Sequence, residues 1–215
     1  MKDENSLNVE IFTDLSFGTN SYMIWREGSD SAVLIDAGLS THLILEFLER
    51  NGLSLEVVLL THGHPDHIAG AAEVASATGA PVYLHSIEIE IVKVLPPALL
   101  AMLGIDELAL PPEFEPLTDD QVLELAGLEI KVLHTPGHSP GSVSFLIDGA
   151  LFDGDLVFRG SIGRTDFPGG DFETLMRSVS EKVFILEPDT KLYPGHMGPS
   201  TVGWEKRTNP FLTGL

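Results

Sequence analysis

The 215-residue sequence contains no cysteine, and this absence excludes several kinds of site. Without thiols, the chain forms neither a disulfide framework nor a cysteine-ligated zinc or iron–sulfur centre, and it has no cysteine nucleophile. Basic residues are also scarce: 12 Lys and Arg stand against 32 Asp and Glu, which gives a formal charge of −20. Because binding to a phosphate backbone depends on Lys and Arg, we expect no nucleic-acid partner.

Long apolar runs are missing as well. The longest ones, such as residues 98–103, fall far short of the ~20 residues that a membrane-spanning helix needs. The N-terminal sequence MKDENSLNVEIF is polar and acidic, where a secretory signal has an apolar core. We therefore expect no membrane partner and a cytoplasmic location. The 43% hydrophobic fraction is typical of a globular protein, and the length is sufficient for a hydrophobic core.

The alternation of apolar runs with turn residues predicts an α/β fold. The expected strands cover residues 9–12, 21–25, 32–35, 57–60, 81–84, 121–125, 128–133, 142–146, 150–152 and 191–193. The expected helices cover residues 41–50, with Ser40 as N-cap, 69–78 and 171–187. Each half runs from strands through a histidine-bearing loop to a helix, and no linker divides them. We therefore expect two similar α/β halves packed into one domain, residues 1–215.

An apolar stretch at residues 98–103 lies between the proline pairs at 96–97 and 111–112. Core packing is the simpler interpretation of this stretch. The flanking prolines also allow a separately hinged helix that covers a site, and the sequence leaves both interpretations open.

The most informative segment is THGHPDH at residues 61–67, directly after a fully apolar run. In an extended loop, His62 and His64 point to the same side, because side chains alternate with a period of two. The following proline turns the chain into a helix, so Asp66 and His67 project in another direction. A polar turn that merely contains histidines does not account for this density of ligands. We predict a metal site that serves two neighbouring ions.

Three further candidate ligands follow predicted strands. They are His138 in TPGHSPGS, Asp155 in FDGD and His196 in YPGH. Each has glycine immediately before it, which permits a close backbone approach. Taken singly, each is more often a turn residue, but with the first segment they form a set of five His and two Asp. That set suits paired Zn²⁺, Fe or Mn ions with an open position for water.

In this order, the motifs THGHPDH, TPGHSPGS, FDGD and YPGH resemble those of the metallo-β-lactamase superfamily, from about residue 20 to residue 200. Within it, FRGSIGRTDFPGGD at 158–171 and the tail TVGWEKRTNPFL are similar to the short, single-domain relatives of glyoxalase II (hydroxyacylglutathione hydrolase). The resemblance implies a four-layer αββα sandwich with the metal site at the shared edge of its two sheets.

The resemblance also implies a ligand set, carried over residue by residue. The first ion would be held by His62, His64 and His138, the second by Asp66, His67 and His196, with Asp155 bridging both.

Three other residues match supporting positions. Asp36 matches a position that usually supports the metal-binding loop, which is reasonable because a metal-binding histidine generally donates its other N–H to a carboxylate or carbonyl. His134 is a candidate for the same supporting role or for a structural role at a strand end. Arg164 is a candidate for a structural or substrate-side role. His42 and His85 are most simply structural.

The implied activity is that of a dinuclear metal-dependent hydrolase. Two divalent ions, zinc first with iron or manganese as alternatives, would act on a small-molecule thioester such as S-acylglutathione by attack of a metal-bridging hydroxide. Asp66 and Asp155 are the expected catalytic carboxylates, and no Ser or Cys nucleophile is required. Because two divalent ions outweigh the two Asp ligands, an anionic substrate can bind despite the acidic composition.

The main alternative is a persulfide dioxygenase acting on glutathione persulfide. Such an enzyme uses one iron with two His and one Asp, which here would be His62, His138 and Asp155. The segment GRTDF at 163–167 resembles that family, whereas PGGD at 168–171 favours the short hydrolases. Nuclease-type members of the superfamily are disfavoured by the negative charge of the chain. The sequence does not indicate which oligomeric state the protein adopts.

Overall fold

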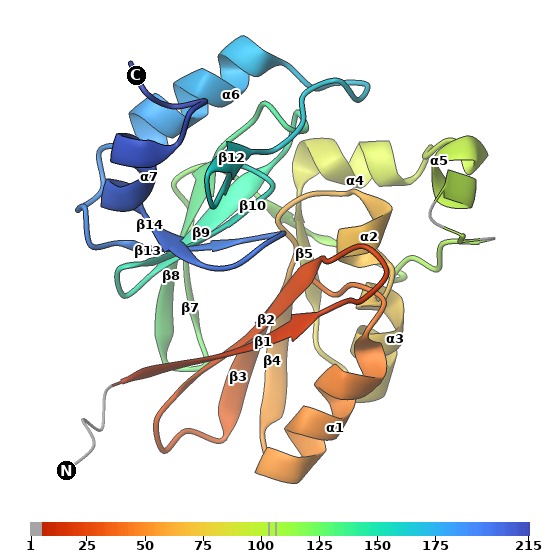
Figure 1. Cartoon of the computed structure of the whole chain (residues 1–215). Helices are drawn as coiled ribbons and strands as arrows, with labels where there is room; N and C mark the ends of the chain where they lie inside the picture. Colours follow the sequence, from red (N-terminus) through yellow and green to blue (C-terminus); the bar gives the residue numbers. More distant parts are fainter. Residues whose placement is uncertain (1–5, 103, 106) are drawn as a thin grey trace.

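Two six-stranded sheets form the centre of the molecule (Figure 1). The computed structural model describes residues 6–102, 104–105 and 107–215. The first sheet has the order β1-β2-β3-β4-β5-β6, in which the first three strands are antiparallel and the later pairs are parallel. Its strands are β1 (Leu7–Thr13), β2 (Asn20–Arg26), β3 (Ser31–Ile35), β4 (Ser54–Leu59), β5 (Val82–His85) and β6 (Glu115–Leu117).

The second sheet has the order β14-β13-β10-β9-β8-β7 and is antiparallel except where β10 pairs with β13. Its strands are β7 (Val122–Leu125), β8 (Leu128–His134), β9 (Val143–Ile147), β10 (Ala150–Gly154), β13 (Lys191–Pro194) and β14 (Ser200–Thr201). A small separate hairpin joins β11 (Val157–Phe158) to β12 (Ser161–Ile162).

Helices cover the outer faces of both sheets (Figure 1). On the side of the first sheet lie α1 (Thr41–Asn51), α2 (Pro65–Ile68), α3 (Ala71–Thr78), α4 (Ser86–Val92) and α5 (Pro97–Met102). On the side of the second sheet lie α6 (Phe172–Ser178), the π-helix Val179–Val183 and α7 (Val202–Thr208). This arrangement confirms the expected αββα sandwich.

Alternate side chains of the central strands belong to different hydrophobic cores. In β3, Ala32 and Leu34 pack with the helices outside the first sheet, while Val33 and Ile35 pack between the two sheets. A third core, which includes Leu175 of α6, covers the outer face of the second sheet. Strands buried on both faces are almost continuously apolar. The apolar run at 57–60 is therefore correctly interpreted as a buried strand, and it corresponds to β4.

The helix expected over residues 69–78 corresponds to α3, which begins two residues later, at Ala71, and is separated from the short helix α2. The chain bends at Gly70, whose N–H donates to the Ala37 carbonyl at 2.8 Å. A Cβ at this position would lie 2.2 Å from the Thr41 side chain, so the bend packs directly against the start of α1. Ser40 occupies the N-cap position of α1 as predicted, but its side chain makes no capping hydrogen bond and donates to Asp14 instead, at 3.3 Å.

The helix expected over residues 171–187 begins as predicted but changes type. Asp171 caps α6 by accepting a hydrogen bond from the Thr174 N–H at 2.8 Å. The next turn is a π-helix, in which the Phe184 N–H donates to the Val179 carbonyl at 2.8 Å. This wider turn lets Val179, Val183 and Phe184 all pack into the core outside the second sheet. Hydrophobic spacing alone does not distinguish it from an α-helix.

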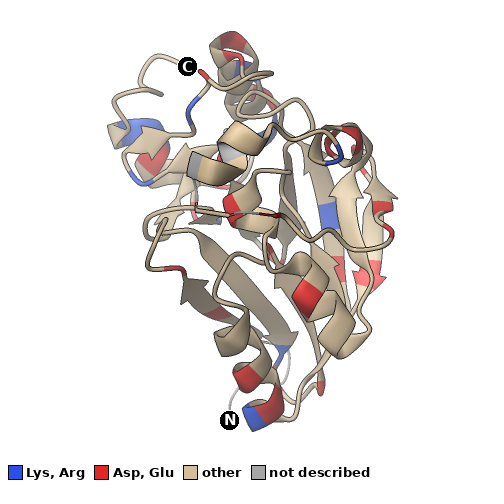
Figure 2. Cartoon of the chain, turned by 90° about the vertical axis from the view of Figure 1, so that its right-hand side faces the viewer, with Lys and Arg blue, Asp and Glu red and all other residues tan. Residues whose placement is uncertain are grey.

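The apolar stretch at 98–103 lies largely in α5, although residue 103 is outside the described residues. Ala98 and Ala101 are exposed, so core packing is wrong for these two positions. Within the described ranges, no helix is long and apolar enough to cross a membrane. The acidic positions in this view of the chain are spread over several helices and strands (Figure 2).

Candidate metal centre

Four segments that follow sheet strands bring seven candidate ligands together. The segment after β4 supplies two histidines and continues into α2, which supplies Asp and His; single ligands follow β8, β10 and β13. Neighbouring potential ligand atoms lie within 4.8 Å of one another in three overlapping groups. These groups are His62, His64 and His138; His62, His67 and Asp155; and Asp66, His67 and His196.

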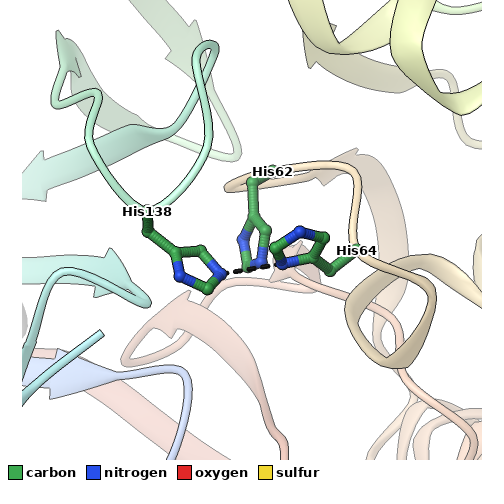
Figure 3. A group of neighbouring side chains, drawn as sticks. All are labelled: His62, His64 and His138. Atoms are coloured by element: carbon green, nitrogen blue, oxygen red, sulfur yellow. Dashed lines mark hydrogen bonds between the residues drawn. The ribbon is translucent and has the colours of Figure 1, made fainter. Parts of the chain in front are cut away.

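The three-histidine group contains His62, His64 and His138. Their rings extend toward one another from two loops, one that carries His62 and His64 and one that carries His138 (Figure 3). His64 Nδ1 lies 2.7 Å from His138 Nε2. Two ring nitrogens reach this distance only when a proton or a cation lies between them. The group is therefore a suitable cage for one metal ion.

Asp155 lies between the two ends of the centre. Its Oδ2 is 3.4 Å from His138 Nε2, and its Oδ1 is 3.4 Å from His67 Nε2. At the far end, His196 Nε2 is 3.4 Å from Asp66 Oδ2. One oxygen of Asp155 thus faces the three-histidine group, and the other faces His67 of the group at the far end, as expected of a ligand shared by two ions.

In two candidate ligands, the ring nitrogen that points away from the centre, Nδ1, has a hydrogen-bond acceptor. His67 Nδ1 lies 2.8 Å from Asp36 Oδ2, and His138 Nδ1 donates to the Arg164 carbonyl at 2.7 Å. These bonds fix the proton on Nδ1 and leave the Nε2 lone pair facing the centre, which is the usual arrangement of a metal-binding histidine.

Asp36 also orients His62, through Thr61. Asp36 accepts from the Thr61 N–H and from its hydroxyl, both at 2.8 Å. The Thr61 hydroxyl has a single proton, so its oxygen accepts from His62 Nδ1 at 3.0 Å. One buried carboxylate, in a left-handed backbone conformation with φ of 56°, therefore sets the orientation of two candidate ligands.

Several buried atoms of the centre have no hydrogen-bond partner among the described residues. They include His62 Nε2, His67 Nε2 and Asp155 Oδ1. Leaving such atoms buried and unpaired costs about 1–3 kcal/mol each. Because all three belong to the candidate ligand groups, the site is suited to a cation that would satisfy them together.

The electrostatics of the centre favour the metal-binding protonation states of His62, His64 and Asp155. Burial lowers the pKa of His62 well below its ordinary value and that of His64 to about 3, so both rings are neutral. Burial raises the pKa of Asp155, but the neighbouring His67 outweighs it and brings that pKa to about 2. Burial also lowers the pKa of His67, yet the carboxylates led by Asp66 raise it above its ordinary value. Metal binding would release that proton.

A cavity of about 200 Å³ opens beside these ligands. Two phenylalanines lie in its wall, and Phe167 contacts the His64 ring with centroids 5.4 Å apart. Arg164 stacks on Phe167 at 3.8 Å and pairs with Asp166 through two hydrogen bonds of 2.7 Å. This ion pair lowers the pKa of the exposed Asp166 to about 2. Arg164 thus contributes its carbonyl to His138 and a paired guanidinium to the cavity wall.

His134 does not join the ligand groups. Its Nε2–H donates to the Pro140 carbonyl at 3.0 Å, and its ring stacks on His85 with centroids 4.6 Å apart. It therefore contacts the base of the loop that carries His138, at a distance from the candidate ligand atoms.

Sequence reasoning missed several residues around the centre. The Thr19 hydroxyl donates to Asp66 Oδ2 at 2.7 Å, and Asn20 donates to the Pro194 carbonyl at 3.0 Å, before the His196 loop. Buried Glu88 contacts two ligand-bearing loops. These residues belong to no motif. The only available signal for Glu88 is its four-residue spacing from Val92, which places both on the buried face of α4.

Comparisons with known proteins show the family to which the chain belongs. The profile of the metallo-beta-lactamase superfamily matches residues 16–196. Hydroxyacylglutathione hydrolase GloC of Haemophilus influenzae is 34% identical over 209 residues, which cover 96% of this chain and 98% of that protein.

Solved structures of metallo-β-lactamase fold proteins are also similar to this chain. The BLEG-1 B3 metallo-beta-lactamase has a TM-score of 0.88 at 35% identity, covering 97% of this chain and 100% of its own. TTHA1623 in a di-iron-bound form has a TM-score of 0.83 at 36% identity, and the match covers 95% of this chain and 100% of that one. ETHE1 from Myxococcus xanthus has a TM-score of 0.81 at 27% identity, and the match covers 96% of this chain and 85% of that one. By profile, sequence and fold, the chain belongs to the metallo-β-lactamase superfamily.

Proposed function

We propose that this protein is a dinuclear metal-dependent hydrolase that cleaves thioesters, with S-acylglutathione as the substrate class. The observation that carries the proposal is the convergence of seven His and Asp ligands around buried atoms without partners. We assign one ion to His62, His64 and His138, a second to Asp66, His67 and His196, and Asp155 to both. Zinc is the first candidate, and iron is the alternative suggested by the di-iron form of TTHA1623.

When bound, such ions lower the pKa of water and polarise a carbonyl group. The side chains of the chain then have separate tasks. Asp155 would hold the two halves of the ligand set together, and Asp66, fixed by the Thr19 hydroxyl, would hold the second ion and orient the water bound there. Phe17 and Phe167 line the cavity and limit access of bulk water. No Ser or Cys nucleophile is needed.

The thioester is the substrate class that the similarity to GloC supports. Arg164 is the cation in the cavity wall. The Asp166 side chain is 69% exposed, so a substrate carboxylate can replace Asp166 at little cost. We assign Arg164 to the binding of an anionic part of the substrate.

A persulfide dioxygenase is the second candidate. It is favoured by the similarity to ETHE1 and by the presence of His62, His138 and Asp155, which suffice for a single iron. The ligands Asp66, His67 and His196 would then have no ion to bind. Their close arrangement around the fully buried His67 favours the dinuclear hydrolase.

Parallel measurements on the purified protein separate the candidates. We expect two metal ions per chain by elemental analysis, hydrolysis of S-lactoylglutathione, and no O₂ uptake with glutathione persulfide. A β-lactam substrate should be cleaved much more slowly than the thioester. One iron per chain together with O₂ uptake would overturn the proposal.

Asp36→Asn tests the support of the ligands. The substitution keeps the shape but places an amide where a carboxylate accepts from Thr61 and faces His67 Nδ1. We expect metal affinity to fall about 10–100-fold, as for other partners of metal-binding histidines. Competition with a chelator measures this, with the exposed Asp30→Asn as control. Unchanged affinity in Asp36→Asn would remove Asp36 from the site.

A further inference from the structure

Helix α4 carries a buried carboxylate that the proposed ligand set does not use. Glu88 is 1% exposed, although its helix lies on the outer face of the first sheet. The neighbouring acidic residue, Glu90, is 75% exposed at its side chain and pairs with Lys93. Glu88 therefore differs from an ordinary surface glutamate and requires its own explanation.

Its two oxygens contact two different loops. Oε2 accepts from the Gly63 N–H at 2.9 Å, between the ligands His62 and His64. Oε1 accepts from the Gly141 N–H and from the Ser139 hydroxyl, both at 2.8 Å. Ser139 directly follows His138 in the chain. One carboxylate thus joins the two loops that supply all three histidines of the first group.

The loops are shaped around this carboxylate. A Cβ at Gly63 would lie 2.8 Å from Glu88 Oε2, and one at Gly141 would lie 2.7 Å from Glu88 Cγ. Both contact points are therefore glycines that leave room for the glutamate side chain. Because two separate loops each have a glycine where they contact Glu88, this contact is a specific feature of the packing.

The charge of Glu88 has no cationic partner among the ion pairs of the described residues. Three N–H and O–H donors solvate it instead. Donors to a buried carboxylate make strong hydrogen bonds, and loss of the acceptor leaves them unsatisfied. A neutral side chain of the same size would therefore loosen both loops together.

We infer that Glu88 is a positioning residue that holds His62, His64 and His138 in register for one metal ion. The inference rests on the ligand assignment proposed above. It is selective, because among the described residues Glu88 accepts no hydrogen bond from α2 or from the His196 loop, whereas Asp36 contacts His67. Glu88 thus supports the three-histidine end and Asp36 supports both ends.

Glu88→Gln tests this, with Glu90→Gln as the matched control on the same helix. The two metal affinities are measured by chelator competition, and the three-histidine site is observed through the visible spectrum of the Co²⁺-loaded protein. We expect Glu88→Gln to weaken the three-histidine site about 10–100-fold. The other site should change by less than about twofold, and Glu90→Gln should change neither.

Ser139→Ala provides a second variant that leaves α4 intact and removes one of the three donors. We expect a smaller loss at the three-histidine site than in Glu88→Gln, and a smaller decrease in the thermal stability of the metal-free protein. Equal weakening of both sites in Glu88→Gln, or wild-type affinity at both, would overturn the inference alone. Failure of the wild-type protein to bind two ions would overturn the proposed function with it.

Discussion

Asp155→Ala is expected to release metal and abolish hydrolysis. Its two oxygens face His138 and His67, each at 3.4 Å, so the substitution removes a ligand from both ends of the centre. It also removes one of the negative charges that raise the pKa of His67 and of His196. We expect kcat/KM for the thioester to fall by about 10³-fold or more, because the ligands act as a unit. Elemental analysis and steady-state kinetics measure the two effects.

The control for this variant is Asp189→Ala, which removes an exposed carboxylate that belongs to none of the candidate ligand groups. It should retain both ions and full activity. If Asp155→Ala retained two tightly bound ions, Asp155 would not be a shared ligand, and the dinuclear assignment would need another bridging group.

Phe152→Ala is expected to cause the largest loss of stability. Phe152 is fully buried between the two sheets, where it stacks on Tyr193 with centroids 4.8 Å apart and meets the Tyr22 ring edge-on at 5.3 Å. The Tyr22 hydroxyl in turn donates to the Pro194 carbonyl at 2.5 Å, so this cluster connects the first sheet to the segment before His196.

Removing a buried phenylalanine ring costs about 3–5 kcal/mol, a large part of the ~5–15 kcal/mol that stabilises a typical domain. Urea unfolding measures the loss. The matched control is Phe211→Ala, whose ring is 51% exposed and whose removal should cost less than about 0.5 kcal/mol. A loss below about 1 kcal/mol in Phe152→Ala would show that the space between the sheets is not a tightly packed core.

The sandwich could be predicted because its signals are local and its motifs are specific. The buried strands are short apolar runs, and their alternate residues divide between two cores, as in β3. The candidate ligands occur directly after strands, within motifs that resemble one family. The spacing of His62 and His64 was sufficient to place them together, and Pro65 was sufficient to start a helix.

The remaining features depend on contacts between distant segments. Glu88 lies 25 residues from Gly63 and 53 residues from Gly141 in the sequence. Its spacing from Val92 indicates the buried face of α4, but it does not reveal which loops the carboxylate contacts. The break at Gly70 depends on the loop before α1, and the π-turn after α6 depends on the shape of the core. Such features require the packed structure, because each is set by a partner that the local sequence does not contain.

The location of the metal ions tests the account most directly. Crystals of the metal-loaded protein, measured above and below the absorption edge of the bound metal, give anomalous peaks that identify each ion. We expect two peaks next to Asp155, one among His62, His64 and His138 and the other among Asp66, His67 and His196. A single peak, or two peaks away from these residues, would contradict the dinuclear centre.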